Sequence, residues 1–263
     1  MEVIGFIAAA LIGVSLGLIG GGGSIITVPV LVYLFSIPPA LATSYSLFIV
    51  GLSSLVGAYK NYKKGFISFK TALLFGTSSI ITVYLTRRLI IPQIPKVFML
   101  GTMHLTESFA IMIFFAILML VASFFMISRE HITYHHQNKL DIFLLLSCGI
   151  GIGLITGFLG AGGGFLLVPA LVLIMKLPMK QAIGTSLLII AFNCLIGFTG
   201  DIGHYNIQWL FLSSVTGIAV SGIIVGDALN KKINGDKLKK GFGWFVLIVS
   251  IYIIIREILY AVK

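Results

Sequence analysis

Two glycine-rich runs could each hold an anion by their backbone N–H groups. The stretch GLIGGGGSIITVPVL covers residues 17–31, and GFLGAGGGFLLVPAL covers residues 157–171. Both runs lie inside long apolar segments, where they should interrupt a helix because glycine destabilises helices by about 1 kcal/mol relative to alanine. The half-helices that follow, from about Ser24 and Gly164, would present unpaired N–H groups at a positive dipole end. Such helix ends bind anions without a lysine or arginine.

A second set of polar residues follows each run. The segment ATSYSL spans residues 42–47 and AIGTSL spans residues 182–187. Their hydroxyls could donate to the oxygens of an anion, or bond back to carbonyls of their own helix. Asn193, which aligns with Ser53, either lines a path or bridges two helices. The candidate substrate-binding residues are therefore Gly21, Gly22, Gly23, Ser24, Ser44, Ser46, Gly162, Gly163, Gly164, Gly184, Thr185, Ser186 and Asn193.

The two sets resemble each other because the chain is an internal duplication. When residues 12–67 are laid on residues 152–207 without gaps, 18 of these 56 positions are identical. Many of the identities are glycines and prolines, which chance matching in an apolar chain does not produce. Internal duplication is common in secondary transporters. The sequence predicts an N-terminal repeat (1–128), a polar linker (129–140) and a C-terminal repeat (141–263).

Composition places both repeats in a membrane. Of 263 residues, 58% are hydrophobic and 10% are charged, whereas soluble domains carry about 25% charged residues. The net charge of +10 comes from residues scattered over short loops, so a nucleic-acid partner is excluded. The predicted fold is an all-α polytopic membrane protein with about eight hydrophobic segments in two homologous halves. These segments are 3–35, 40–59, 66–86, 97–127, 142–175, 181–199, 207–229 and 241–260.

Segments 3–35 and 142–175 are too long for one simple crossing, and two layouts are open. Each segment is either one broken crossing, with the halves parallel, or a re-entrant hairpin, with the halves inverted. The inverted layout places 13 basic residues on one side and 5 on the other, against 10 and 8 for the parallel layout. The positive-inside rule therefore favours inverted repeats with both termini outside the cell.

The paired glycine runs and the AIGTSL segment resemble the signatures of the sulfite exporter TauE/SafE family, also called the 4-toluene sulfonate uptake permease family. The resemblance covers nearly the whole chain. It implies a multi-pass transporter of the inner or plasma membrane, with small sulfur-containing anions such as sulfite, thiosulfate or organosulfonates as substrates. One departure is that Ser44 and Tyr45 stand where the second copy has Gly184 and Thr185.

Few other residues suggest chemistry. His104 and Glu107 share a helix face at i, i+3 spacing, so they either couple a proton to transport or form a surface or packing pair. Asp227 is expected to pair with Lys231 at i+4. His131 and His135 have a metal-pair spacing, but they lie in a polar loop and no metal site is expected. The chain shows no nucleophile with a base and no ATP-site motif, so we expect neither an enzyme nor a bound cofactor.

The predicted function is a secondary transporter, on the resemblance an exporter, of small sulfur-containing anions bound at half-helix N-termini near the membrane midplane. The alternative is an anion channel or a permease for a small solute without sulfur. Expected partners are the small anionic substrate and the lipid bilayer. A homo-oligomer stays open.

Overall fold

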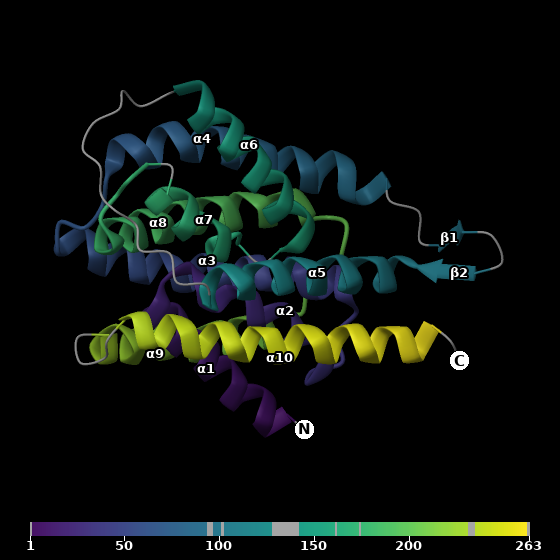
Figure 1. Ribbon diagram of the computed structural model, residues 1–263. Coiled ribbons are helices and arrows are strands. Elements are labelled where there is room, and N and C mark those ends of the chain that lie inside the picture. Colours follow the sequence, from purple (N-terminus) through teal and green to yellow (C-terminus); the bar gives the residue numbers. More distant parts are fainter. Residues whose placement is uncertain are drawn as a thin grey trace.

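The computed structural model describes residues 2–93, 97–100, 103–127, 142–160, 162–173, 175–230 and 235–261. Helices dominate this part of the chain, with one two-stranded hairpin (Figure 1). The elements in order are α1 (Glu2–Ile19), η1 (Gly21–Ile26), α2 (Thr27–Tyr33), α3 (Pro39–Lys63), α4 (Phe69–Leu85), η2 (Thr86–Ile90), η3 (Ile91–Gln93), β1 (Val97–Leu100), β2 (Met103–Thr106), α5 (Glu107–Ile127), α6 (Ile142–Leu159), α7 (Gly164–Leu173), α8 (Met179–Asp201), α9 (Trp209–Asn230) and α10 (Gly235–Ala261).

The helices recur in the same order in the two halves of the chain. The helix α1 corresponds to α6, α2 to α7, α3 to α8, α4 to α9 and α5 to α10. The packing follows the same rule: α1 lies along α9 as α6 lies along α4, while α3 packs on α8 and α5 on α10. The first helix of each half, α1 or α6, thus packs on a helix of the other half, α9 or α4, so the halves are interlocked.

Each half opens with a broken segment, and the first of the two turns back on itself. In the first half, Phe35 beyond α2 lies against Gly5 near the start of α1, and Gly23 lies against Ser15 near its end. The rings of Phe6 and Phe35 meet edge to face, with centroids 5.6 Å apart. The prediction that the first apolar segment of each half is broken is therefore confirmed, and in the first half the segment forms a hairpin.

Corresponding helices run in opposite directions. Gly51 and Gly57 of α3 face Leu195 and Leu187 of α8, so these two helices are antiparallel. The helix α5 runs away from the hairpin of β1 and β2, whereas α10 runs back toward that end and the C-terminus (Figure 1). The inverted layout requires equivalent helices of the two halves to be antiparallel, as α3 and α8, and α5 and α10, are.

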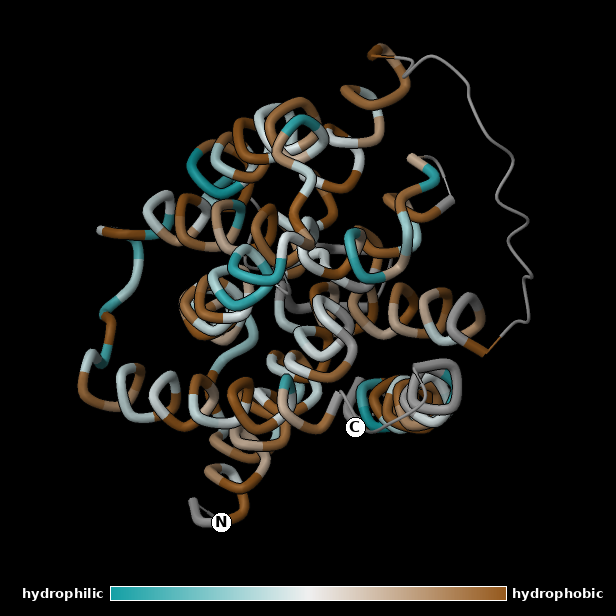
Figure 2. Tube along the Cα trace, turned by 90° about the vertical axis from the view of Figure 1, so that its left-hand side faces the viewer, coloured by the Kyte–Doolittle hydropathy of each residue, from teal (hydrophilic) through white to brown (hydrophobic). Residues whose placement is uncertain are grey.

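Among the described residues, five helices are long and apolar enough to cross a membrane: Pro39–Lys63, Phe69–Gln93, Ile142–Leu159, Met179–Asp201 and Trp209–Leu229. Large apolar side chains such as Leu73, Phe143 and Leu210 are exposed. Figure 2 shows the same pattern, with hydrophobic residues spread around the helices on their outer as well as their inner sides. A surface of this kind suits contact with lipid, and the chain is a multi-pass membrane protein.

The segment expected at 97–127 is helical only from Glu107. Before that residue β1 and β2 pair in antiparallel fashion, with Val97 opposite Thr106 and Leu100 opposite Met103. Valine, phenylalanine and threonine favour strands, and an acidic residue favours a helix N-terminus. The apolar run therefore divides at Glu107.

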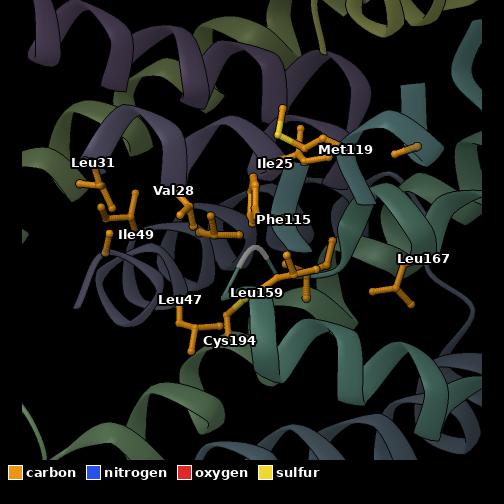
Figure 3. Packing of buried hydrophobic residues seen from close by; sticks show 14 of the residues in the cluster. Ile25, Val28, Leu31, Leu47, Ile49, Phe115, Met119, Leu159, Leu167 and Cys194 are labelled. Atoms are coloured by element: carbon orange, nitrogen blue, oxygen red, sulfur yellow. The ribbon is translucent and has the colours of Figure 1, made fainter. Parts of the chain in front are cut away.

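The two short half-helices form the centre of the packed core. Ile25, Val28 and Leu31 of the first hairpin and Leu167 of α7 are almost fully buried. Figure 3 shows Ile25 and Val28 near Phe115 of α5 and Ile49 of α3, and all of these side chains belong to one buried cluster with Leu167. The helices α3 and α8 are the most buried of the long ones, so the glycine breaks lie inside protein rather than against lipid.

Candidate functional site

The two glycine breaks meet. A Cβ atom added to Gly164 would lie 2.3 Å from the Cα of Gly21, and a Cβ atom added to Gly21 would lie 2.4 Å from the Cα of Gly164. Neither position tolerates a side chain, because each backbone already occupies the other's space. The two helix breaks are therefore in direct backbone contact.

Several of these glycines are also required by the backbone itself. Gly20 (φ 75°), Gly160 (φ 65°), Gly162 (φ 70°) and Gly163 (φ 63°) adopt left-handed conformations, which other residues rarely adopt. A Cβ atom at Gly163 would in addition lie 2.0 Å from the Thr156 Oγ1 atom. At these positions the backbone leaves the right-handed helical conformation, and the chain turns away from the ends of α1 and α6.

The breaks differ in detail between the copies. In the second copy α7 begins at Gly164, as expected, and its first bonds run from the Leu166 and Leu167 N–H groups to the Gly163 carbonyl. In the first copy the interruption is confined to Gly20. A 3₁₀ helix resumes at Gly21 and includes Gly22, Gly23 and Ser24, so the expected start near Ser24 is wrong. The Ser24 hydroxyl donates back to the Gly21 carbonyl.

The hydroxyls at positions 45 and 185 hold the two halves together. The Ser68 N–H, just before α4, donates to Thr185 Oγ1 at 3.0 Å, and the Gln208 N–H, just before α9, donates to Tyr45 Oη at 2.8 Å. Residues 45 and 185 are equivalent in the repeat, as are 68 and 208. The sequence differs between the copies at this position, but Tyr45 and Thr185 have the same structural role: each accepts a hydrogen bond from a backbone N–H of the other half.

The other predicted residues of α3 and α8 are buried but do not all point to a ligand. Asn193 Nδ2 donates to Ser79 Oγ of α4 at 2.7 Å, so Asn193 bridges helices. The Ser186 hydroxyl donates to the Ile183 carbonyl of its own helix. Gly184 packs directly against the Phe66 carbonyl. In contrast, the buried Ser46 hydroxyl has no hydrogen-bond partner among the described residues.

A buried ion pair lies beside the second break, and sequence reasoning missed it. Arg87 is 1% exposed and Asp201 is 2% exposed. The Arg87 Nη1 atom lies 3.0 Å from Asp201 Oδ2 and donates to Thr43 Oγ1 at 3.1 Å. Ser44 lies beside the same carboxylate. The pair joins η2, directly after α4, to the end of α8, next to Gly160.

The sequence held two signals for this pair. Arg87 directly follows the predicted segment 66–86, and the apolar helical stretch in the structure continues past it to Gln93. Asp201 is the only acidic residue between Asp141 and Asp227. An ionisable residue within a span is a functional candidate by default, so both Arg87 and Asp201 are functional candidates.

The equivalent positions in the other half carry a different pair. Asp227 of α9 corresponds to Arg87, and it lies 2.7 Å from Lys64 and 3.8 Å from Lys60 at the end of α3. These three side chains are one fifth to one third exposed. The expected partner, Lys231, lies outside the described residues. Charges of opposite sign thus occupy equivalent positions in the two halves.

Some sequence predictions fall where side chains are not described. His104 lies in β2 and Glu107 opens α5, so the expectation that the two residues share one helix face is wrong. His131 and His135 lie outside the described residues, as does the whole of the polar linker 129–140. Among the side chains that are described, no three metal-ligating residues come together.

One open pocket lies apart from the breaks. It has a volume of about 370 Å³ and is lined by Leu34, Phe35, Ser36, Ile37, Pro38, Leu41, Tyr45, Gln208 and Phe211. It contains none of the predicted substrate-binding residues, and most of its lining is apolar. The glycine breaks remain the better candidate for a site that receives a small anion.

Two interlocked halves, each with an interrupted helix at the centre of the protein, are typical of membrane transporters built from internal repeats. Comparison with known families agrees with this class. Residues 5–253 match the family model described as "Sulfite exporter TauE/SafE". The chain belongs to this family.

Its curated relatives are also transporters by name. A "probable membrane transporter protein" of Xylella fastidiosa (strain Temecula1) is 29% identical over 95% of this chain and 94% of its own length. A "probable membrane transporter protein" of Bacillus subtilis (strain 168) is 29% identical over 89% and 88%. One from Methanocaldococcus jannaschii is 26% identical over 88% and 84%. No solved structure matches the chain.

Proposed function

We propose that this protein is a secondary transporter that exports small sulfur-containing oxyanions or sulfonates, and that the substrate binds in the region where the two glycine breaks meet. The observation that carries the proposal is the direct contact of Gly21 and Gly164, which brings two interrupted helices together inside the protein. The sulfur chemistry comes from the family, and the position of the site comes from the breaks.

The breaks offer donors suited to an oxyanion. The N–H groups of the first helical turn have no partners within a helix, and the α7 turn starts at Gly164 with its first internal bond formed only by Leu166. The helix dipole adds positive potential at this end. Gly162, Gly163 and Gly164 add no side chain beside these N–H groups, and the unpaired Thr156 hydroxyl lies at the Cβ position of Gly163.

Unpaired hydroxyls extend from the breaks along α3. Ser46, Ser53 and Ser54 are fully buried, and their hydroxyls have no hydrogen-bond partner among the described residues. Polar groups buried in a membrane protein without partners are costly and tend to mark a substrate path. A polar row of this kind on α3, one of the two most buried long helices, supports a route for a small polar solute past the breaks.

The orientation is part of the proposal. The N-terminal repeat (1–128) and the C-terminal repeat (141–263) are taken as inverted copies, with the Lys60–Lys64 end of α3 in the cytoplasm. The connection between α3 and α4 lies at the same end as the start of α8, the end of α9 and the start of α10 (Figure 1). These loops are the lysine-rich ones, which the positive-inside rule places in the cytoplasm. A proton-coupling role for His104 and Glu107 stays a prediction.

A binding panel tests the substrate class. The purified protein is melted in detergent at constant ionic strength with thiosulfate, sulfite, methanesulfonate or sulfate, and with the neutral analogues methanesulfonamide and dimethyl sulfone. A ligand that binds the folded state at 100 times its Kd stabilises it by about 2.7 kcal/mol. We expect at least one sulfur anion to raise the melting temperature and the neutral analogues to have no effect. Equal shifts with anions and neutral analogues would contradict the proposal.

A further inference from the structure

We propose that Arg87 binds the anion at the second glycine break, through the Nε–Nη2 edge of its guanidinium. This inference deepens the proposed function and rests on it, because the anion is taken to be the transported one. Asp201 then acts as the resident counter-ion on the Nη1 side. The site is a single one that lies at the second break, beside Gly160.

Among the described residues, only one of the three guanidinium nitrogens of Arg87 has hydrogen-bond partners. Its Nη1 atom contacts Asp201 and Thr43, whereas Nε and Nη2 are buried and have no hydrogen-bond partner among the described residues. Leaving donors of a buried cation unpaired is costly, so an acceptor is expected there. The Nε–Nη2 edge presents two parallel N–H groups, which match the oxygens of a sulfonate, sulfite or similar oxyanion.

The free edge faces the break. The Arg87 Nη2 atom lies 2.7 Å from the position that a Cβ atom on Gly160 would occupy. Only a glycine therefore lets the guanidinium reach the backbone of the break. A buried arginine with unpaired donors and a glycine that leaves it room are independent observations, and they point to the same spot.

A hydroxyl completes the set of donors on the other side of the turn. Thr156 of α6 is fully buried, and its Oγ1 atom has no hydrogen-bond partner in the described part of the chain. This atom lies 2.0 Å from the Cβ position of Gly163. The turn between Gly160 and Gly163 thus has an unpaired guanidinium edge at one end and an unpaired hydroxyl at the other.

The first break has neither an arginine nor a hydroxyl at the equivalent positions. The residue equivalent to Arg87 is Asp227, and the residue equivalent to Thr156 is Leu16. Asp227 offers no donor and is paired with Lys64 and Lys60, and leucine offers no donor either. The repeat is symmetric in its backbone but not in its charge, so we infer one anion site per chain.

Asp201 and the bound anion would share one guanidinium. Two negative groups on one cation repel each other, which weakens anion binding relative to a site without the carboxylate. Neutralising Asp201 should therefore tighten anion binding, whereas removing the Arg87 charge should weaken it. A purely structural role for the pair would not give effects of opposite sign.

The test measures thiosulfate binding by calorimetry on folded, monodisperse variants. Arg87→Gln is combined with Asp201→Asn, so that no charge is left buried without its partner. Asp201→Asn alone keeps the cation, and Arg88→Gln is the matched control because Arg88 is the next residue and is exposed. We expect thiosulfate affinity to fall roughly 10- to 100-fold in the double variant, as for the loss of a charge-assisted hydrogen bond. Affinity should rise in Asp201→Asn and stay unchanged in Arg88→Gln.

Either of two results overturns the inference: a folded double variant that binds thiosulfate as the unaltered protein does, or Asp201→Asn binding that is unchanged or weaker. If the double variant fails to fold, the Asp201→Asn result decides alone. If the unaltered protein binds no sulfur anion, the same variants are tested with nitrate and phosphate as probes. A loss there would support Arg87 as an anion-binding residue while the sulfur substrate of the proposed function fails.

Discussion

Gly21 and Gly164 touch backbone to backbone, although they belong to opposite halves of the duplicated chain. The contact joins the end of one interrupted segment to the start of the half-helix in the other. It explains why both runs consist of glycine where a simple helix break would need only one or two. The close approach also makes the centre of the protein sensitive to a single methyl group.

Gly164→Ala should destabilise the protein. The added methyl would lie 2.3 to 2.6 Å from backbone atoms of Gly21, which cannot move aside as a side chain can. Overpacking of this kind costs about 1–3 kcal/mol, seen as a lower melting temperature. Gly151→Ala is the control, since its added Cβ meets nothing within 4 Å. Equal melting temperatures for the two variants would show that the breaks do not meet.

The two ion pairs at equivalent positions should differ in their contribution to stability. Asp201→Asn leaves Arg87 buried without a counter-charge, which costs about 3 kcal/mol or more. Asp227→Asn breaks a partly exposed pair with Lys64, which costs at most about 1 kcal/mol. Thermal melting compares the two. Thiosulfate should raise the melting temperature of Asp201→Asn more than that of the unaltered protein, because the anion replaces the lost charge. Similar costs for both variants would argue against a buried Arg87.

The hydroxyls of Tyr45 and Thr185 should matter for stability and not for the substrate. Tyr45→Phe and Thr185→Val each leave a backbone N–H, of Gln208 or Ser68, without its acceptor. Each loss should cost about 1–3 kcal/mol and leave thiosulfate affinity unchanged. Tyr59→Phe, at an exposed tyrosine, is the control. A Thr185→Val variant of normal stability but weakened binding would return Thr185 to the binding site.

Labelling of single cysteines tests the inverted arrangement. In a background with Cys148 and Cys194 replaced, Asn61→Cys and Lys180→Cys should react only from the cytoplasmic side. Arg88→Cys should react only from outside, because α4 carries the chain to the opposite end. The reagent is a membrane-impermeant maleimide applied to intact cells and to inverted vesicles. Opposite accessibility of Asn61 and Lys180 is the pattern that parallel halves would give.

The sequence was informative wherever a feature repeated. Glycine runs, prolines and their constant spacing between the two copies predicted the duplication and the broken segments, because each follows from local backbone preference and symmetry. Charge counting favoured inversion, and the antiparallel α3 and α8 agree with it.

The roles of single polar residues could not be predicted in the same way. Thr185 was expected to face a ligand, but its partner is the N–H of Ser68, 117 residues away. Arg87 was counted among loop charges, since nothing near it in sequence reveals Asp201. Such pairings depend on which helices pack together, and the apolar segments are too alike to specify that.

Counterflow in proteoliposomes tests the central claim most directly. Vesicles containing the purified protein are loaded with unlabelled thiosulfate and diluted into a trace of labelled thiosulfate, with methanesulfonamide loading as the control. A carrier for sulfur anions predicts transient, saturable accumulation of label above equilibrium in the thiosulfate-loaded vesicles alone, reduced in the Arg87→Gln and Asp201→Asn double variant. Label that only equilibrates without accumulating would indicate a channel. The absence of any protein-dependent flux of thiosulfate, sulfite or methanesulfonate would contradict the account.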